Sequence, residues 1–130
     1  MCRILLSINP QHVENIVHGK KCYEYRKRTC KRKVDKIIIY STCPVKQVIG
    51  EVEVLDTLEM DKDELWKLTK DQSGITRKFY NAYFKGKKTA VAYKLGSVLK
   101  YDSPQSLKDI GIKVAPQSFL YLPDTDNVCM

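Results

Sequence analysis

Two charged residues lie two positions apart in a stretch whose other residues alternate as in a β-strand. Over Lys21–Arg28 this alternation places Cys22, Glu24 and Arg26 on one face and two tyrosines on the other. If the charged face points inward, Glu24 and Arg26 must pair or bind a ligand, because an isolated buried charge is costly. If it points outward, they form a surface pair that contributes little stability. The pattern therefore leaves open a polar cleft or an ordinary surface.

The neighbouring Lys21 adds a second cation that suits an anionic ligand. A lysine ammonium binds phosphate as a compact charge, whereas the planar fork of Arg26 binds a phosphate or the edge of a nucleobase. Glu24 would accept a hydrogen bond from an exocyclic amine or hold Arg26 in place. In an enzyme, Glu24 would activate a water while Lys21 stabilises the developing oxyanion, without a covalent intermediate. Lys21 and Glu24 are thus the candidate catalytic residues, should the chain be an enzyme.

The segment Arg26–Lys36 carries the densest positive charge of the chain, with seven cations and one acid in eleven residues. Clustered lysines and arginines displace counterions from phosphates and give salt-sensitive, largely sequence-independent affinity. The alternative is a solvated loop whose charge aids solubility, but the charge density favours binding. Six of these cations form the predicted nucleic-acid rim, called the basic rim below: Lys27, Arg28, Lys31, Arg32, Lys33 and Lys36.

The composition is that of an ordinary globular protein with a basic bias. The 130 residues are 43% hydrophobic and 29% charged, with a net charge of +8. We expect one domain over residues 1–130, with a flexible tail at about 123–130. The apolar runs are too short to cross a bilayer, and the N-terminal stretch does not resemble a secretory signal. Five widely spaced cysteines and two histidines lack metal-ligand spacing, so we expect free thiols, no metal, no cofactor and a cytoplasmic location.

Short strands and helices follow one another along the chain with few residues between them. The pattern predicts strands at 3–8, 21–28, 34–40, 48–55, 89–95, 97–101 and 119–122. It predicts a helix from Pro10 to Gly19 with Asn9 as N-cap, and further helices at 61–70, 76–85 and 103–111. Because strands outnumber helices, we expect an α+β fold around a small mixed or antiparallel barrel.

Apolar faces of the predicted helices identify further core residues. Leu65 and Leu68 share a face of one helix, and Leu107 and Ile110 face inward from another. An aromatic stripe on the helix at 76–85 is typical of a core face, while a base-stacking surface and a protein-interaction surface are the alternatives. The stripe consists of Phe79, Tyr80, Tyr83 and Phe84.

The run Gly19-Lys20-Lys21-Cys22-Tyr23-Glu24-Tyr25-Arg26 fits the GxKxxExR signature of the ASCH domain family, which this sequence resembles. The preceding helix and the segments 40–44, 50–52 and 115–119 resemble the same family in the same order, so the resemblance covers nearly the whole chain. It implies a small PUA-like β-barrel with flanking short helices, and a cleft proposed for the family as an RNA-binding site. RNA or a nucleotide is therefore the expected partner. By position, that cleft would be lined by Lys21, Glu24, Arg26, Ser41, Thr42, Gln117 and Ser118, of which the last four would equally serve as turn or cap residues.

One branch of the family resembles an amidohydrolase that deacetylates N4-acetylcytidine with a lysine, a threonine nucleophile three residues later and a more distant glutamate. Lys21 matches the lysine, but Glu24 lacks the hydroxyl that acyl transfer needs, so that mechanism does not carry over as it stands. Other members are proposed as ribonucleases that use a tyrosine, a lysine and a serine, parts that Tyr93 and Ser118 would take beside Lys21. We therefore predict an RNA- or nucleotide-binding protein, with a hydrolase acting on a modified nucleoside or on RNA as the alternative.

Overall fold

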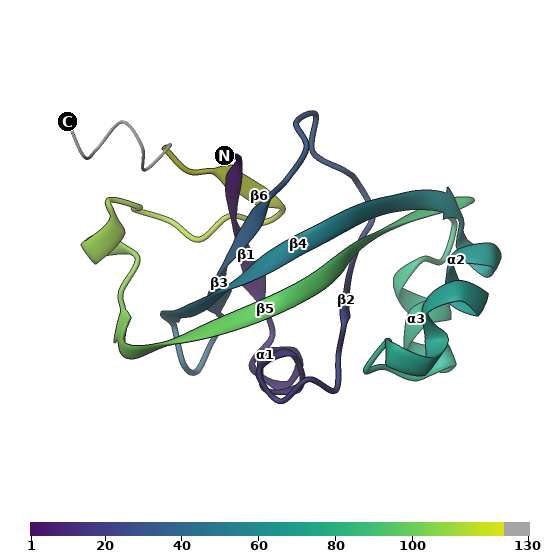
Figure 1. Ribbon diagram of the computed structural model, residues 1–130, viewed down its shortest axis with the longest axis horizontal. Helices are drawn as coiled ribbons and strands as arrows, with labels where there is room; N and C mark the ends of the chain where they lie inside the picture. Colours follow the sequence, from purple (N-terminus) through teal and green to yellow (C-terminus); the bar gives the residue numbers. More distant parts are fainter. Residues whose placement is uncertain (124–130) are drawn as a thin grey trace.

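The computed structural model describes residues 1–123, in which six strands form one mixed sheet that curls into an open barrel (Figure 1). In the sheet the strand order is β2-β5-β4-β3-β1-β6, and β1 and β3 run parallel while the other neighbours are antiparallel. With its short helices, this sheet confirms the predicted α+β small barrel. The strands are β1 (Arg3–Ile8), β2 (Tyr23–Arg26), β3 (Lys36–Ser41), β4 (Gln47–Asp61), β5 (Thr89–Gln105) and β6 (Phe119–Tyr121).

Three α-helices, α1 (Pro10–Val17), α2 (Lys62–Thr69) and α3 (Arg77–Tyr83), begin at side-chain caps. Before α1, the Asn9 side chain accepts a hydrogen bond from the backbone N–H of Gln11, as its N-cap position predicts. Two short 3-10 helices, η1 (Lys70–Gln72) and η2 (Lys108–Ile110), complete the elements. None of the helices in residues 1–123 is long and apolar enough to span a membrane.

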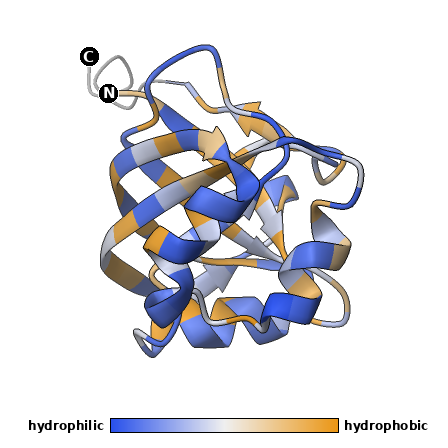
Figure 2. Cartoon of the chain, turned by 90° about the vertical axis from the view of Figure 1, so that its right-hand side faces the viewer, coloured by the Kyte–Doolittle hydropathy of each residue, from blue (hydrophilic) through white to orange (hydrophobic). Residues whose placement is uncertain are grey.

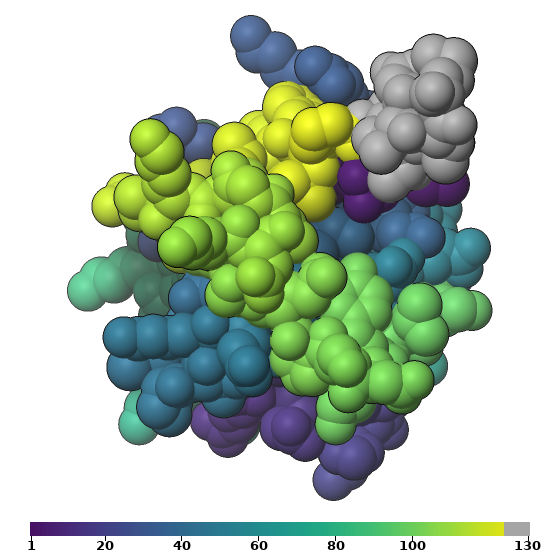
Figure 3. Space-filling model, turned by 90° about the vertical axis from the view of Figure 1, so that its left-hand side faces the viewer, coloured from purple at the N-terminus to yellow at the C-terminus, as the bar shows by residue number. Residues whose placement is uncertain are grey.

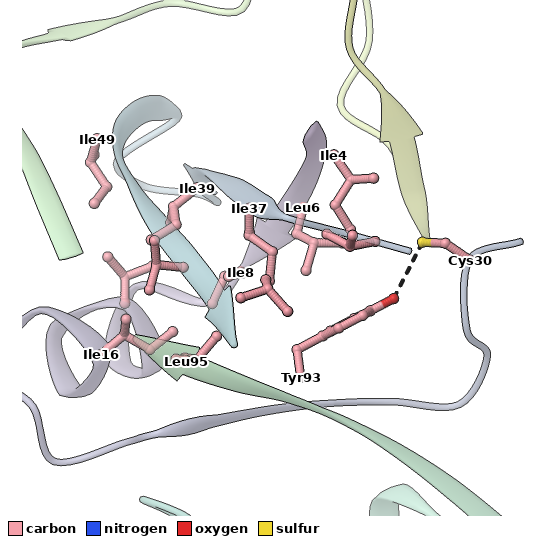
Figure 4. Packing of buried hydrophobic residues seen from close by; sticks show 14 residues of the cluster. Ile4, Leu6, Ile8, Ile16, Cys30, Ile37, Ile39, Ile49, Tyr93 and Leu95 are labelled. Atoms are coloured by element: carbon pink, nitrogen blue, oxygen red, sulfur yellow. Dashed lines mark hydrogen bonds between the residues drawn. The ribbon is translucent and has the colours of Figure 1, made fainter. Parts of the chain in front are cut away.

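The barrel interior is filled by side chains from alternate positions of the strands. Figure 2 shows the resulting bands of hydrophobic and hydrophilic residues along the sheet. In the interior, Tyr93 of β5 lies among isoleucines and leucines, and its hydroxyl lies 3.2 Å from the Cys30 sulfur (Figure 4). Each such side chain contributes about 1.5–3 kcal/mol when fully buried. Prominent members of this cluster are Ile4, Leu6, Ile37, Ile39, Val52 and Leu95.

Two further clusters attach the helices and the C-terminal segment to the sheet. Tyr80 and Phe84 pack with Tyr25 of β2 and so fix α3 and α2 beyond the ends of the long strands. On the other side, Leu5 and Ile38 are covered by the segment that follows β5, light green to yellow in Figure 3. Because that segment returns to β1 through β6, residues near position 118 are brought close to β1.

Several predictions on the elements are wrong or incomplete. Gly96 does not divide two strands, because β5 runs on through it to Gln105 as a partner of the similarly long β4. Ser103 and Pro104 therefore belong to β5, and the predicted helix at 103–111 is reduced to η2, which ends at Gly111 with φ 79°. Of the expected tail, residues 124–130 lie outside the described residues.

The helix faces also differ from the expectation in part. Leu65 is fully buried while Leu68 is 61% exposed, because α2 packs through Leu65, Trp66 and Thr69. Leu107 and Ile110 are partly buried against the sheet, as expected. In the aromatic stripe only Tyr80 and Phe84, four positions apart, are fully buried in the core, and Phe79 is 48% exposed.

We predict that Gly50→Ala destabilises the sheet more than Gly96→Ala. A Cβ atom at Gly50 would lie 2.5 Å from the backbone carbonyl oxygen of Leu99, next to a register shift between β4 and β5, and backbone cannot move aside cheaply. At Gly96 the nearest atom is the flexible carboxylate end of Glu53. We expect a loss of about 1–3 kcal/mol in the free energy of unfolding for Gly50→Ala, measured by urea denaturation. Equal losses for the two variants would contradict this account.

Candidate functional site

A cavity of about 470 Å³ opens where β2, α1 and the turn before α3 meet. Helix α1 contributes His12 and Asn15, strand β2 contributes Glu24 and Arg26, and Lys21 projects from the segment between them. Exposed or partly buried aromatic rings from α3 form another wall. The cavity therefore combines charged groups with apolar rings, which is typical of a small-molecule or nucleotide site.

Lys21, Glu24 and Arg26 form a largely buried charge cluster in the wall of this cavity. Their side chains are 3%, 8% and 18% exposed, respectively. The Arg26 guanidinium donates to Glu24 Oε2 at 2.9–3.0 Å, and Lys21 Nζ lies 3.8 Å from Glu24 Oε1. The charged face of β2 thus points inward, and the carboxylate has a cation beside each of its oxygens.

Arg26 also bridges the open side of the barrel. The sheet ends at β2 and β6, and β6 pairs with β1 only at residues Ile4–Leu6. One nitrogen of Arg26, Nη2, donates to the backbone carbonyl of Ser7 at 3.0 Å. A side chain thereby satisfies a β1 carbonyl just beyond the pairing of β1 with β6, and Ser7 and Arg26 both line the cavity.

The position of Lys21 is fixed from three sides. Its Nζ lies 4.8 Å from the centre of the Tyr25 ring and 3.4 Å from the Ser73 carbonyl oxygen. Gly74, with φ 71°, packs against it so closely that an added Cβ atom would lie 2.6 Å from Lys21 Cβ. Burial lowers the pKa of the Lys21 ammonium from 10.5, the nearby Glu24 carboxylate opposes that shift, and Arg26 adds to it.

His12 is a cavity residue that the sequence analysis did not identify. Its Nδ1 atom is buried and has no hydrogen-bond partner among residues 1–123, and its ring lies edge-on to Phe79 at 5.4 Å. Burial lowers the pKa of His12 below 6.5; Lys21 and Arg26 lower it further, while Glu24 raises it. The available signal was the spacing of His12 and Asn15, three residues apart on a helix whose other face is apolar.

A second cavity, also about 470 Å³, adjoins the first one. Both are lined by Arg26 and Tyr83, so these two residues form a wall common to both cavities. Gln117 and Ser118 line the second cavity but not the first, together with Tyr93 and the first residues of the basic rim. Tyr93 and Ser118 are therefore in one cavity and Lys21 is in the other.

The remaining predicted site residues lie in different surroundings. Ser41 is buried in β3 and Thr42 forms the following turn; neither lines these two cavities. Lys36 forms an ion pair with Glu51 at 2.5 Å, next to a separate hollow. The other five residues of the basic rim are exposed in the connection between β2 and β3, which is the loop at the top of Figure 1: Lys27, Arg28, Lys31, Arg32 and Lys33.

Comparison with known proteins gives consistent matches. Residues 6–101 match the family model described as the ASCH domain. The chain is 33% identical over 92 residues to a Zymomonas mobilis protein named ASCH domain-containing ribonuclease, which covers 70% of this chain and 62% of that protein. It is also 32% identical to the ATP synthase subunit alpha and 31% identical to the large ribosomal subunit protein uL22 of Ureaplasma parvum. Each match covers 92% of this chain but only 15% and 39% of those proteins. The chain thus spans less than two thirds of the length of these relatives.

Solved structures resemble this one over nearly their whole length. The crystal structure of ASCH from Zymomonas mobilis has a TM-score of 0.87 at 29% identity, covering 97% of this chain and 91% of that chain. A mutant of the same protein, with a tyrosine replaced by phenylalanine, has a TM-score of 0.87 at 28% identity, covering 98% and 96%. The N-terminal domain of Staphylothermus marinus McrB shares the fold, with a TM-score of 0.50 at 18% identity and coverage of 83% and 78%.

We predict opposite shifts in the pKa of His12 when its charged neighbours are neutralised. Lys21→Met should raise the pKa because it removes a positive charge, and Glu24→Gln should lower it because it removes a negative one. Histidine ring signals followed by NMR over a pH series measure both shifts. Lys20→Met is the matched control, because Lys20 is exposed and does not line the cavity. An unchanged pKa in Lys21→Met would show that the two side chains are not neighbours in solution.

Proposed function

The chain belongs to the ASCH domain family, as its sequence predicts, and on this premise we propose that it binds RNA by taking one nucleotide into the cavity at Lys21. The main support for this proposal is that the cavity holds two largely buried cations, Lys21 and Arg26, around one carboxylate, Glu24. The exposed residues of the basic rim attract the rest of the strand. The relative named ribonuclease supports RNA as the class of ligand.

The charge of the site matches one phosphodiester. With Lys21 protonated, the two cations and Glu24 leave a net charge of +1 on side chains that are largely buried in the cavity wall. A single phosphodiester group carries the compensating charge of −1, so binding it removes an unbalanced charge from a partly buried site. Burial lowers the pKa of His12 from 6.5, with Lys21 and Arg26 adding to the shift, and so disfavours a further positive charge in the cavity.

Arg26 retains donors for this phosphate. Its Nε and Nη2 atoms bond Glu24 and the Ser7 carbonyl, while Nη1 has no protein partner among the described residues. A guanidinium has five N–H donors in a rigid plane. Glu24 therefore holds the arginine in one orientation while leaving part of the fork to a ligand.

The aromatic wall suits the base of the same nucleotide. Phe79 and Tyr83 line the cavity, Phe79 exposed and Tyr83 partly buried, although Tyr83 also packs against Phe84 of the aromatic cluster. Stacking of a base on an aromatic side chain contributes about 1–3 kcal/mol. The groups around the cavity thus suit both ends of a nucleotide.

We predict that Lys21→Met weakens RNA binding about tenfold or more, because it removes a buried cation facing the phosphate. The measurement is fluorescence anisotropy with a labelled single-stranded oligoribonucleotide at 50 mM and 200 mM salt. Lys20→Met, which removes a charge one residue away but outside the cavity, should change the Kd less than threefold. Thermal unfolding of both variants checks that the fold is intact. Equal Kd values for wild type and Lys21→Met would refute the proposed site.

Hydrolysis is the second candidate function, favoured by one observation. The ammonium of Lys21 has a lowered pKa and lies 3.8 Å from the carboxylate of Glu24, so proton transfer and oxyanion stabilisation are available in one cavity. In this scheme Glu24 takes a proton from a water that attacks the substrate. However, both oxygens of Glu24 already face a cation, which commits this carboxylate to holding Lys21 and Arg26.

We predict that any turnover of RNA or of acylated nucleosides depends on both Lys21 and Glu24. Lys21→Met and Glu24→Gln should each abolish product formation, while Lys20→Met should leave it unchanged. Product is measured by chromatography after incubation with single-stranded RNA and with a panel of N-acylated nucleosides. Absence of product with the wild-type chain across this panel rules the hydrolase out and leaves the binding proposal intact.

A further inference from the structure

Lys21 is a buried amine whose positive charge is only partly satisfied. An ammonium has three N–H donors, yet among residues 1–123 the Ser73 carbonyl oxygen, at 3.4 Å, is the one acceptor within hydrogen-bond distance of Nζ. The nearest carboxylate oxygen of Glu24 lies 3.8 Å away, while the same carboxylate accepts from Arg26 at 2.9–3.0 Å. Glu24 is thus bound more closely to the guanidinium than to the amine.

The surroundings of Lys21 favour the neutral form of this amine. Its side chain is 3% exposed, and Nζ lies 4.8 Å from the centre of the Tyr25 ring. Burial lowers the pKa of Lys21 from 10.5, Glu24 opposes that shift and Arg26 adds to it. A lysine that is desolvated or lies next to another cation is suited to attack a carbonyl carbon, because the lone pair of its nitrogen is free.

The cavity beside this amine fits a small planar molecule that carries a negative charge. Lys21 and Arg26 both line it, and Phe79 and Tyr83 supply aromatic rings for a flat ligand. Its volume of about 470 Å³ is typical of small-molecule sites. The Nη1 atom of Arg26 has no protein partner among the described residues, so an anionic group on the ligand has a donor close to the amine.

We propose that Lys21 is a nucleophile that forms an imine with a small planar aldehyde bearing an anionic group. This activity goes beyond RNA binding and needs the cavity but no RNA. The neutral Nζ attacks the carbonyl carbon, a C–N bond forms, and one proton passes from the nitrogen to the oxygen to give a carbinolamine. A second proton then follows the same route, the C–O bond breaks and water leaves, so amine and aldehyde become imine and water.

Glu24 is placed to move the protons of this step. Its Oε1 atom lies 3.8 Å from Lys21 Nζ, and its Oε2 atom is held by Arg26. When Nζ is neutral, Oε1 no longer faces a charge, so it takes a proton from the nitrogen and delivers it to the oxygen in each half of the step. Arg26 keeps the carboxylate in place through both transfers.

The test uses the full chain and an equimolar amount of pyridoxal 5′-phosphate, a planar aldehyde with a phosphate group, at neutral pH. Absorbance follows the imine, borohydride then reduces it to a stable amine, and peptide mass spectrometry locates the label. We expect Lys21 to carry about tenfold more label than Lys20, which is exposed and does not line the cavity. Pyridoxal, which lacks the phosphate, should label Lys21 about fivefold less. Equal labelling of the two lysines would overturn the inference.

Lys21→Met and Lys20→Met form the matched pair of variants. Lys21→Met should lose the imine absorbance and Lys20→Met should retain it, while thermal unfolding checks that both variants fold. Imine absorbance at the wild-type level in Lys21→Met would contradict the proposal.

Glu24→Gln tests the part given to the carboxylate. The midpoint of Lys21 labelling over a pH series should move to lower pH, because Glu24 opposes the lowering of the Lys21 pKa. The maximum rate should fall, because the proton carrier is removed. An unchanged midpoint and rate would overturn the role of Glu24.

The reactive amine and the RNA site fail separately. Imine formation at Lys21, together with an RNA Kd that Lys21→Met leaves unchanged, would refute the RNA site and keep the reactive amine. No imine at Lys21, together with RNA binding that Lys21→Met weakens, would overturn the reactive amine and keep the RNA site.

Discussion

The buried carboxylate of Glu24 is the constraint on which the rest of the site depends. A single negative charge in the barrel wall is costly unless it is paired, and here Arg26 and Lys21 approach it from two sides. The pairing orients both cations, and the second nitrogen that Arg26 offers reaches the Ser7 carbonyl. The same three side chains therefore bridge the open barrel and charge its cavity, so the cavity and the fold share one set of interactions.

The open barrel follows from the order of the strands. Because β2 and β6 are the two edges of the sheet, their neighbourhood lacks strand pairing and is instead lined by side chains from both ends of the chain. The loop between β2 and β3 carries the exposed residues of the basic rim to this edge, where Arg32 contacts Tyr121. A fully closed barrel would offer no such gap, so the incomplete pairing is what makes a concave and cationic surface available.

Local patterns in the sequence predicted much of the fold because each depends on near neighbours. The cap at Asn9, the end of α1 just before Gly19 and the shared face of Glu24 and Arg26 all follow from residues within one turn or one strand, whereas the direction of that face was left open. The long β5 could not be predicted, since Gly96 lies at a register shift and the strand continues only because β4 pairs with the residues on both sides of it. Likewise, the partner of Lys36 could not be predicted: the register of β3 against β4 places it opposite Glu53, and its ammonium pairs with Glu51, the diagonal neighbour on β4.

The site was predictable to the same extent and for the same reason. Glu24 and Arg26 share a face by alternation alone, whereas the direction of Lys21 depends on Gly74, more than fifty residues away, which leaves room for it. The common wall of the two cavities needs Tyr83 from α3 beside Arg26, a long-range contact that no local pattern contains.

Glu24 also separates this chain from the amidohydrolase branch that its signature resembles. A threonine at position 24 would supply a nucleophile but would leave Lys21 and Arg26 facing each other without a carboxylate between them. Two buried cations without a counter-charge repel and lose their fixed orientation. Glu24, which stands where that branch has its nucleophile, is thus also the residue that lets both cations remain buried and ordered. In this chain the signature position of that nucleophile is taken by a carboxylate that holds Lys21 and Arg26 in place.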